Sequence, residues 1–167
     1  EPDIKLILHE IQSLGHRIAL HFDVAAYDVA QGDFDLLEQH ACFERGVLAG
    51  LLGCQIKAIS FHSPDVGNAL QYDQELIGGM YNTYARKLRD EYEYGSDSCG
   101  YWRFKRLPDF LAKREADKLQ ILTHPVWWTR GEGSPRSKVV RSIDGRGARA
   151  LSRYDDLLAQ LGRENVR

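Results

Sequence analysis

Residues 119–128, LQILTHPVWW, decide how we interpret the rest of this chain. A short apolar run leads to a histidine, which Pro125 and two adjacent tryptophans follow. Because proline lacks an N–H and disfavours helix at the residue before it, the run predicts a buried strand that stops on His124. Sites in α/β proteins lie at the carboxyl ends of strands. His124 and the tryptophans are therefore candidate site residues, and the alternative is a core strand whose tryptophans only pack.

The overall composition is that of an ordinary globular chain. The 167 residues are 43% hydrophobic and 28% charged, with a formal net charge of −2, and we expect a single domain over residues 1–167. No apolar run reaches the roughly 18 residues that a transmembrane helix needs. The three cysteines lack CxxC spacing, which argues against a disulfide framework or a zinc knuckle. We interpret them as thiols of a cytoplasmic protein.

Positive charge concentrates in residues 130–167, which hold nine Lys/Arg and five Asp/Glu. A basic tail can favour phosphates, anionic lipid or nucleic acid. These arginines form no dense run, so we favour a solvated amphipathic helix over residues 146–162. We expect no nucleic-acid partner and no transmembrane segment, and homo-oligomerisation is left open.

Hydrophobic periodicity and end signals predict helices separated by strands, an α/β pattern. Helices are expected at 3–14, from Asp33 to Gly53, and at 107–118, with Glu44 interrupting the apolar face of the second. Strands are expected at 16–23 and 55–61. Residues 65–80 lack periodicity and predict a long loop. An opening helix is unusual for an α/β domain, so we expect that part of the fold precedes residue 1.

Three predicted strands end on or beside a histidine, namely His21, His62 and His124. A metal site or a proton-transfer site needs imidazoles at equivalent strand ends, and we expect the three to share one pocket. Asp23 lies two residues after His21. Such a pair can hold one metal ion or form an ordinary hydrogen bond.

Asp97 lies between two serines in GSDSCG at residues 95–100. Its carboxylate could act as a base, a ligand or a turn residue, and the local sequence favours the turn. Nucleophilic serine catalysis is disfavoured because the GxSxG motif is absent.

Four separated segments share a further pattern. They are GHRIALHFD at 15–23, SFHSPD at 60–65, YGSDSCGYW at 94–102 and LTHPVWW at 122–128. In this order and spacing they resemble the later motifs of the polysaccharide deacetylase family, and more closely a branch found among bacterial surface-polysaccharide genes. The resemblance covers residues 10–130 and is most specific around His21 and His124. It implies a distorted or incomplete β/α barrel.

The resemblance also implies a hydrolase. In that family a divalent metal, commonly zinc, activates water to remove an N-acyl group from a sugar. By position His21 matches a metal ligand, and His124 matches the histidine that protonates the departing amine. Asp97 falls in the Asp/Trp motif and is a second catalytic candidate. The candidate substrate-binding residues are Asp23, Trp102, Arg103, Trp127 and Trp128. The implied substrate is a carbohydrate, or a nucleotide-linked or lipid-linked sugar, in polysaccharide or lipopolysaccharide assembly.

The chain departs from the family pattern at the metal site. The family's second metal histidine would lie four residues after His21, where this sequence has Ala25. The family's first motif, which carries two aspartates, has no counterpart here. We interpret the chain as the C-terminal portion of a longer protein in which His62 or Asp23 replaces the missing ligand. The alternative function is a glycan-binding module without a complete metal shell.

Overall fold

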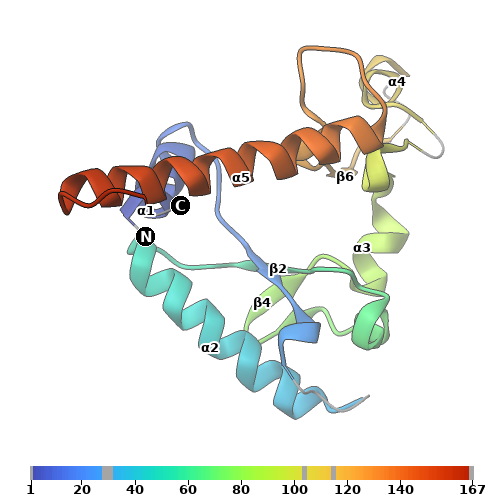
Figure 1. Cartoon of the computed structure of the whole chain (residues 1–167). Helices are drawn as coiled ribbons and strands as arrows, with labels where there is room; N and C mark the ends of the chain where they lie inside the picture. The colour runs from blue at the N-terminus through green and yellow to red at the C-terminus, as the bar shows by residue number, and fades with distance from the viewer. Residues whose placement is uncertain (1, 28–31, 103–104, 114–115, 166–167) are drawn as a thin grey trace. The chain divides into compact units, whose positions relative to one another are not determined.

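The computed structural model describes residues 2–27, 32–102, 105–113 and 116–165. The chain forms two compact units, Glu1–Glu91 and Tyr92–Arg167. Each unit combines helices and strands, so the chain has an α/β fold (Figure 1). The single domain expected over residues 1–167 stays a prediction.

The first unit contains a four-stranded mixed sheet. Its strands, in the order β1-β2-β4-β3, are β1 (Leu20–Phe22), β2 (Ala58–Phe61), β4 (Met80–Asn82) and β3 (Leu76–Ile77). Strand β2 pairs in parallel with β1 and β4, and β3 is antiparallel to β4. The two predicted strands are confirmed, although both are shorter than expected.

The long loop predicted for residues 65–80 is wrong. This region holds the 3-10 helix Val66–Gln71, strand β3 and the start of β4. The strands β3 and β4 turn through Gly78 and Gly79, both with positive φ, a conformation that glycine adopts at little cost. Strands of two and three residues are too short to show an alternating hydrophobic pattern.

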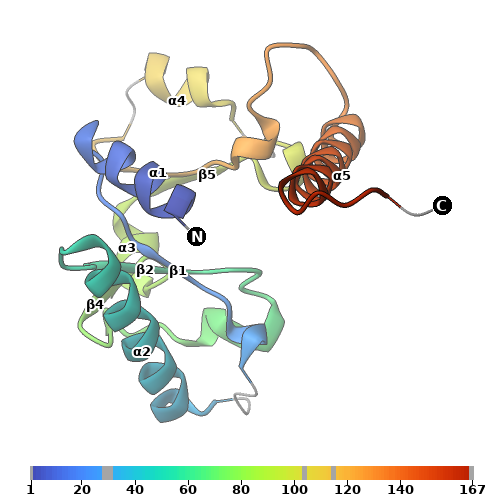
Figure 2. The same ribbon diagram turned by 60° about the vertical axis from the view of Figure 1, so that its left-hand side comes forward.

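Helices α1 (Pro2–Ser13) and α2 (Phe34–Leu52) confirm two predicted helices. The Asp33 side chain accepts a hydrogen bond from the Leu36 N–H at 3.0 Å, and Gly53 ends α2 in the left-handed conformation. Figure 2 shows α2 beside the sheet, and its buried residues join Phe22, Ile59 and other sheet residues in one core. The 3-10 helix Val24–Ala26 and the short helix α3 (Arg86–Glu91) complete this unit.

The second unit contains a parallel pair of strands, β5 (Glu93–Ser96) and β6 (Leu119–Leu122). Helix α4 (Leu107–Lys113) ends earlier than the predicted residue 118 and buries Phe110 beside Gly95. Strand β6 is only partly buried and stops at Leu122, so the prediction of a buried strand reaching His124 is wrong. The reason is that the described residues give β6 a single neighbouring strand.

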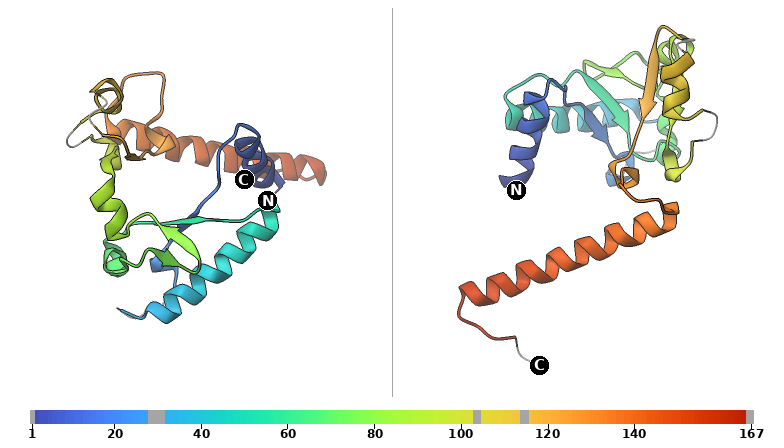
Figure 3. Two further views of the ribbon diagram at one scale, coloured as in Figure 1. Left: turned by 180° about the vertical axis from the view of Figure 1, so that it is seen from behind. Right: turned by 90° about the horizontal axis from the view of Figure 1, so that it is seen from above.

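The C-terminal helix α5 (Pro135–Gln160) begins well before the predicted residue 146 (Figure 3). The Ser134 hydroxyl accepts a hydrogen bond from the Ser137 N–H at 3.2 Å, and Pro135 occupies the first turn. Gly145 and Gly147 lower helix propensity by about 1 kcal/mol each, yet the helix continues through them. The described part of the chain contains no helix that is long and apolar enough to cross a bilayer. The distorted or incomplete β/α barrel stays a prediction.

Candidate functional site

Asp97 and His124 form the main polar contact of the second unit. Asp97 directly follows β5 and His124 lies two residues after β6, and the parallel pairing of Ser96 with Leu122 brings them to the same end of the sheet. The Asp97 N–H extends this ladder by donating to the Leu122 carbonyl at 3.2 Å. Strand pairing therefore brings into contact two residues that are 27 positions apart in the sequence.

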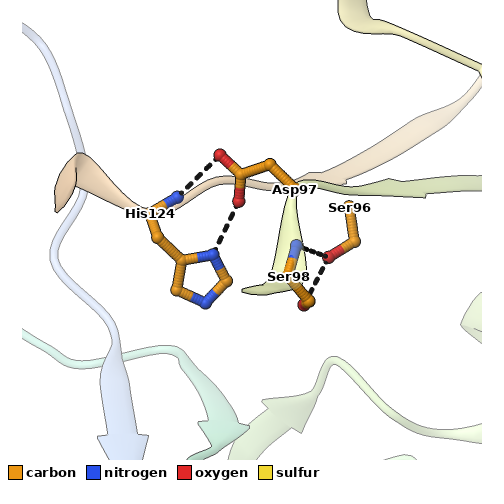
Figure 4. Close-up of polar contacts among 4 residues, drawn as sticks. All are labelled: Ser96, Asp97, Ser98 and His124. Atoms are coloured by element: carbon orange, nitrogen blue, oxygen red, sulfur yellow. Dashed lines mark hydrogen bonds and ion pairs between the residues drawn. The ribbon is translucent and has the colours of Figure 1, made fainter. Parts of the chain in front are cut away.

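One carboxylate holds both the ring and the backbone of His124. Oδ1 of Asp97 lies 2.6 Å from His124 Nδ1, and Oδ2 accepts a hydrogen bond from the His124 backbone N–H at 3.2 Å (Figure 4). The Asp97 side chain is 5% exposed, whereas the His124 side chain is 42% exposed. A buried carboxylate needs such partners because burial of an unpaired charge is costly. The contact fixes the imidazole, and the second ring nitrogen is directed away from Asp97 (Figure 4).

The serines beside Asp97 make the turn that the local sequence assigned to the aspartate. Ser96 Oγ accepts a hydrogen bond from the Ser98 N–H at 3.0 Å and lies 2.6 Å from the Ser98 hydroxyl. Asp97 precedes the 3-10 helix Ser98–Gly100, but its side chain forms no capping hydrogen bond there. The Asp97 carboxylate is therefore available to His124, and the turn role favoured by the local sequence belongs to Ser96.

The predicted substrate-binding tryptophans lie in three different environments. Trp102 lines a pocket of about 370 Å³. Trp127 belongs to the 3-10 helix Pro125–Trp127, and its ring lies 3.3 Å from the position that a Cβ on Gly100 would take. Its indole N–H is buried without a hydrogen-bond partner among the described residues. Trp128 is largely exposed. Arg103, a further candidate, lies outside the described residues.

The first unit brings His21 and His62 together. His21 lies opposite Ser60 in the β1–β2 pair, and His62 directly follows β2. The ring centroids are 5.5 Å apart in an edge-to-face arrangement, and His21 Nδ1 lies 2.8 Å from Ser60 Oγ. Ser60 is a contact that the sequence analysis missed, and only the strand register reveals it. The single pocket expected for His21, His62 and His124 stays a prediction.

The described residues of this unit do not complete a zinc site. Asp23, one of the two candidates for the missing ligand, uses Oδ1 to accept a hydrogen bond from the Ala25 N–H at 3.0 Å and so caps a 3-10 helix. Within the described part of the chain no group of three His, Cys, Asp or Glu side chains is placed to hold a metal ion. A catalytic zinc ion takes three protein ligands, so His21 and His62 alone do not fit one.

Glu44 interrupts the apolar face of α2 because its carboxylate binds the hydroxyl of Tyr27. The Tyr27 hydroxyl donates to Glu44 Oε1 at 2.5 Å, and its ring stacks on His40 with a centroid separation of 4.0 Å. The hydrogen bond, burial and the negative charge of Glu44 raise the pKa of Tyr27 to about 12. The partners lie 17 positions apart, so local periodicity does not show the pairing.

A scan against protein-family models, a search of curated proteins and a search of solved structures found no match to this chain.

Proposed function

We propose that this chain is a hydrolase that removes an N-acyl group from a sugar, with His124 as general acid and Asp97 as the residue that orients it. The hydrogen bond of 2.6 Å between the buried Asp97 carboxylate and the accessible His124 ring carries this proposal. A buried carboxylate paired with Nδ1 of a histidine is a recurring device for proton transfer in acyl chemistry. The motif resemblance to polysaccharide deacetylases, with their distorted β/α barrel, supports the same roles.

Hydrolysis adds water to the acyl carbon, and the adduct then breaks down to a carboxylic acid and an amine. The proposed role of His124 is to give a proton to the departing nitrogen as this carbon–nitrogen bond breaks. Amide cleavage needs this proton because an amine anion is a poor leaving group. With Nδ1 bonded to Asp97, protonated His124 presents an Nε2–H to the leaving nitrogen. After the transfer, Asp97 holds the neutral ring in the tautomer that keeps its proton on Nδ1. The Asp97 charge also stabilises the imidazolium before the transfer.

The remaining parts of the proposal concern substrate and location. The substrate is a carbohydrate, or a nucleotide-linked or lipid-linked sugar, used for surface polysaccharide in the cytoplasm. The motif resemblance supports the substrate, and the three cysteines without CxxC spacing support the location. A divalent metal such as zinc at His21 and His62 stays a prediction, and the proton transfer at His124 is argued without it.

The test is steady-state turnover of N-acetylated amino sugars by the wild-type chain and His124→Ala. Loss of a general acid lowers kcat by about 10²–10⁴-fold, and we expect KM to change little. His9→Ala, which removes an exposed histidine, is the matched control and should retain full activity. Equal losses in kcat and in substrate affinity would contradict the acid role. Absence of turnover by the wild-type chain with added divalent metal would contradict the hydrolase.

A glycan-binding module is the second candidate. The absence of a three-ligand metal group among the described residues favours it. It predicts binding of sugars by the wild-type chain without release of acetate. Calorimetric binding measured alongside acetate release separates the two candidates, because only the hydrolase consumes the ligand.

A further inference from the structure

A pocket in the second unit lies next to the turn that follows Asp97. Its volume is about 370 Å³, and its lining residues are Gly100, Tyr101, Trp102, Arg106, Leu107 and Pro108. Small-molecule pockets commonly measure about 300–1,000 Å³, so this one is suited to a ligand of about one sugar ring.

Backbone hydrogen bonds connect this pocket to the Asp97–His124 pair. The Gly100 N–H donates to the Asp97 carbonyl at 2.8 Å, and the Tyr101 N–H donates to the Ser98 carbonyl at 3.2 Å. Gly100 has a φ of +74°, and a Cβ there would lie 2.8 Å from the Pro135 ring. Glycine at position 100 therefore permits a tight turn. This turn places the first lining residue of the pocket three positions after Asp97.

The charge of the pocket comes from Arg106. It is the charged residue among the lining residues, and its guanidinium forms no hydrogen bond or ion pair with the described part of the chain. The neighbouring Lys105 is instead paired with Glu93 at 2.6 Å. Asp109 uses its carboxylate to accept a hydrogen bond from the Arg106 backbone N–H at 3.0 Å. An available guanidinium fork matches the oxygens of a carboxylate or a phosphate.

The other walls suit the ring of a sugar. Trp102 and Tyr101 contribute aromatic rings, which pack against the apolar faces of flat ligands while their edges remain in water. We propose that this pocket binds an anionic sugar, whose pyranose ring packs against Trp102 and Tyr101 and whose carboxylate or phosphate pairs with Arg106. The inference rests on the proposed function for its choice of a sugar, and it makes the substrate an acidic or phosphorylated one.

The test is calorimetric binding of four probes to the full chain. They are a hexuronic acid, a hexose 1-phosphate, a neutral N-acetylhexosamine and inorganic phosphate. We expect at least one charged sugar to bind about tenfold more tightly than the neutral sugar, because a charge-assisted hydrogen bond is added. The better of the two charged sugars identifies the anion, and inorganic phosphate should bind weakly because it cannot use the aromatic walls.

Arg106→Gln should abolish the preference for the charged sugar and leave binding of the neutral sugar unchanged. Arg163→Gln removes an exposed positive charge after α5 and should keep the preference. Circular dichroism of each variant checks that it folds. Equal binding of charged and neutral sugars by the wild type would overturn the inference. So would equal losses in both variants, or inorganic phosphate binding as tightly as the sugar phosphate.

His124→Ala separates this inference from the proposed function. It should lose turnover while it keeps the Arg106-dependent preference for the charged sugar. Arg106-dependent binding without turnover in the wild type would reject the hydrolase and keep the anionic-sugar site. Turnover that depends on His124 but not on the charge of the sugar would keep the hydrolase and reject the anionic-sugar site.

Discussion

Within the described part of the chain, the buried polar or charged residues are Asn82 in the first unit and Asp97 in the second, and they are held in different ways. Asn82 in the first unit donates to the carbonyls of Tyr72 at 2.6 Å and Gln74 at 3.2 Å, and accepts from the Tyr84 N–H at 2.9 Å. All of these partners are backbone groups. Asp97 in the second unit pairs with His124, a titratable side chain that is 42% exposed. The comparison teaches that a buried polar group held by backbone stabilises the fold, whereas one held by an accessible titratable side chain is suited to chemistry.

The two units also differ in the size of their hydrophobic cores. The first unit contains a cluster of buried residues that includes Phe22, Ile59, Phe61 and Met80. In the second unit Phe110 is the buried hydrophobic residue within the described part of the chain. The first unit thus has the larger core, and truncation of its buried side chains should lower the free energy of unfolding more than truncations in the second unit.

Phe22→Ala should give the largest loss of stability. Phe22 is 0% exposed and contacts Phe61 and Tyr27, so its removal leaves a cavity in a packed core. We expect the free energy of unfolding to fall by about 3–5 kcal/mol. Urea denaturation measures this change. Phe43→Ala on the exposed face of α2 is the matched control and should cost less than about 0.5 kcal/mol. Similar losses of stability in the two variants would contradict the placement of Phe22 in a packed core.

Asn82→Ala and Asp97→Asn test the contrast between the two buried polar groups. Asn82→Ala removes the hydrogen bonds to the Tyr72 and Gln74 carbonyls and from the Tyr84 N–H, and we expect the free energy of unfolding to fall by about 1–3 kcal/mol in urea denaturation. Asp97→Asn keeps the shape of the side chain and should cost less stability. It should, however, change the ¹⁵N chemical shifts of the His124 ring, because an amide cannot accept hydrogen bonds at both of its ends as the carboxylate does. The proposed contrast is wrong if Asp97→Asn leaves the ¹⁵N chemical shifts of the His124 ring unchanged.

Tyr27 should give the smallest effect, a change confined to high pH. Its pKa is raised from 10.0 to about 12, so the fold favours the protonated phenol. The stabilisation is complete below pH 10, where the tyrosine is protonated in both states, and is lost as the pH rises through about 12. Glu44→Gln should move the pKa back toward 10.0, as measured by ultraviolet absorbance of the phenolate. Tyr27→Phe identifies the signal, and an unchanged pKa in Glu44→Gln would contradict the pairing.

Elements with local signals were predictable. The limits of α2 follow from Asp33 and Gly53, which act on backbone groups within one turn. Strand β5 was not predictable, because Gly95 faces the Phe110 ring and the segment has no alternating apolar pattern. Its pairing with β6 joins residues such as Glu93 and Leu119, which are far apart in the sequence. The late start expected for α5 was wrong, because the helix begins at Pro135 after the Ser134 cap and continues through Gly145 and Gly147.

The sequence by itself determined the chemistry that is available: the histidines after or within strands, the carboxylates beside them and the aromatic residues near His124. It also determined the helices whose caps lie within a few residues. Only the tertiary structure decided which carboxylate meets which imidazole. Local sequence favoured a turn role for Asp97, and strand pairing instead placed its carboxylate on His124. The physical reason is that capping and turn formation act within one turn of chain, whereas a buried charge is satisfied by whichever partner the long-range pairing of strands brings to it.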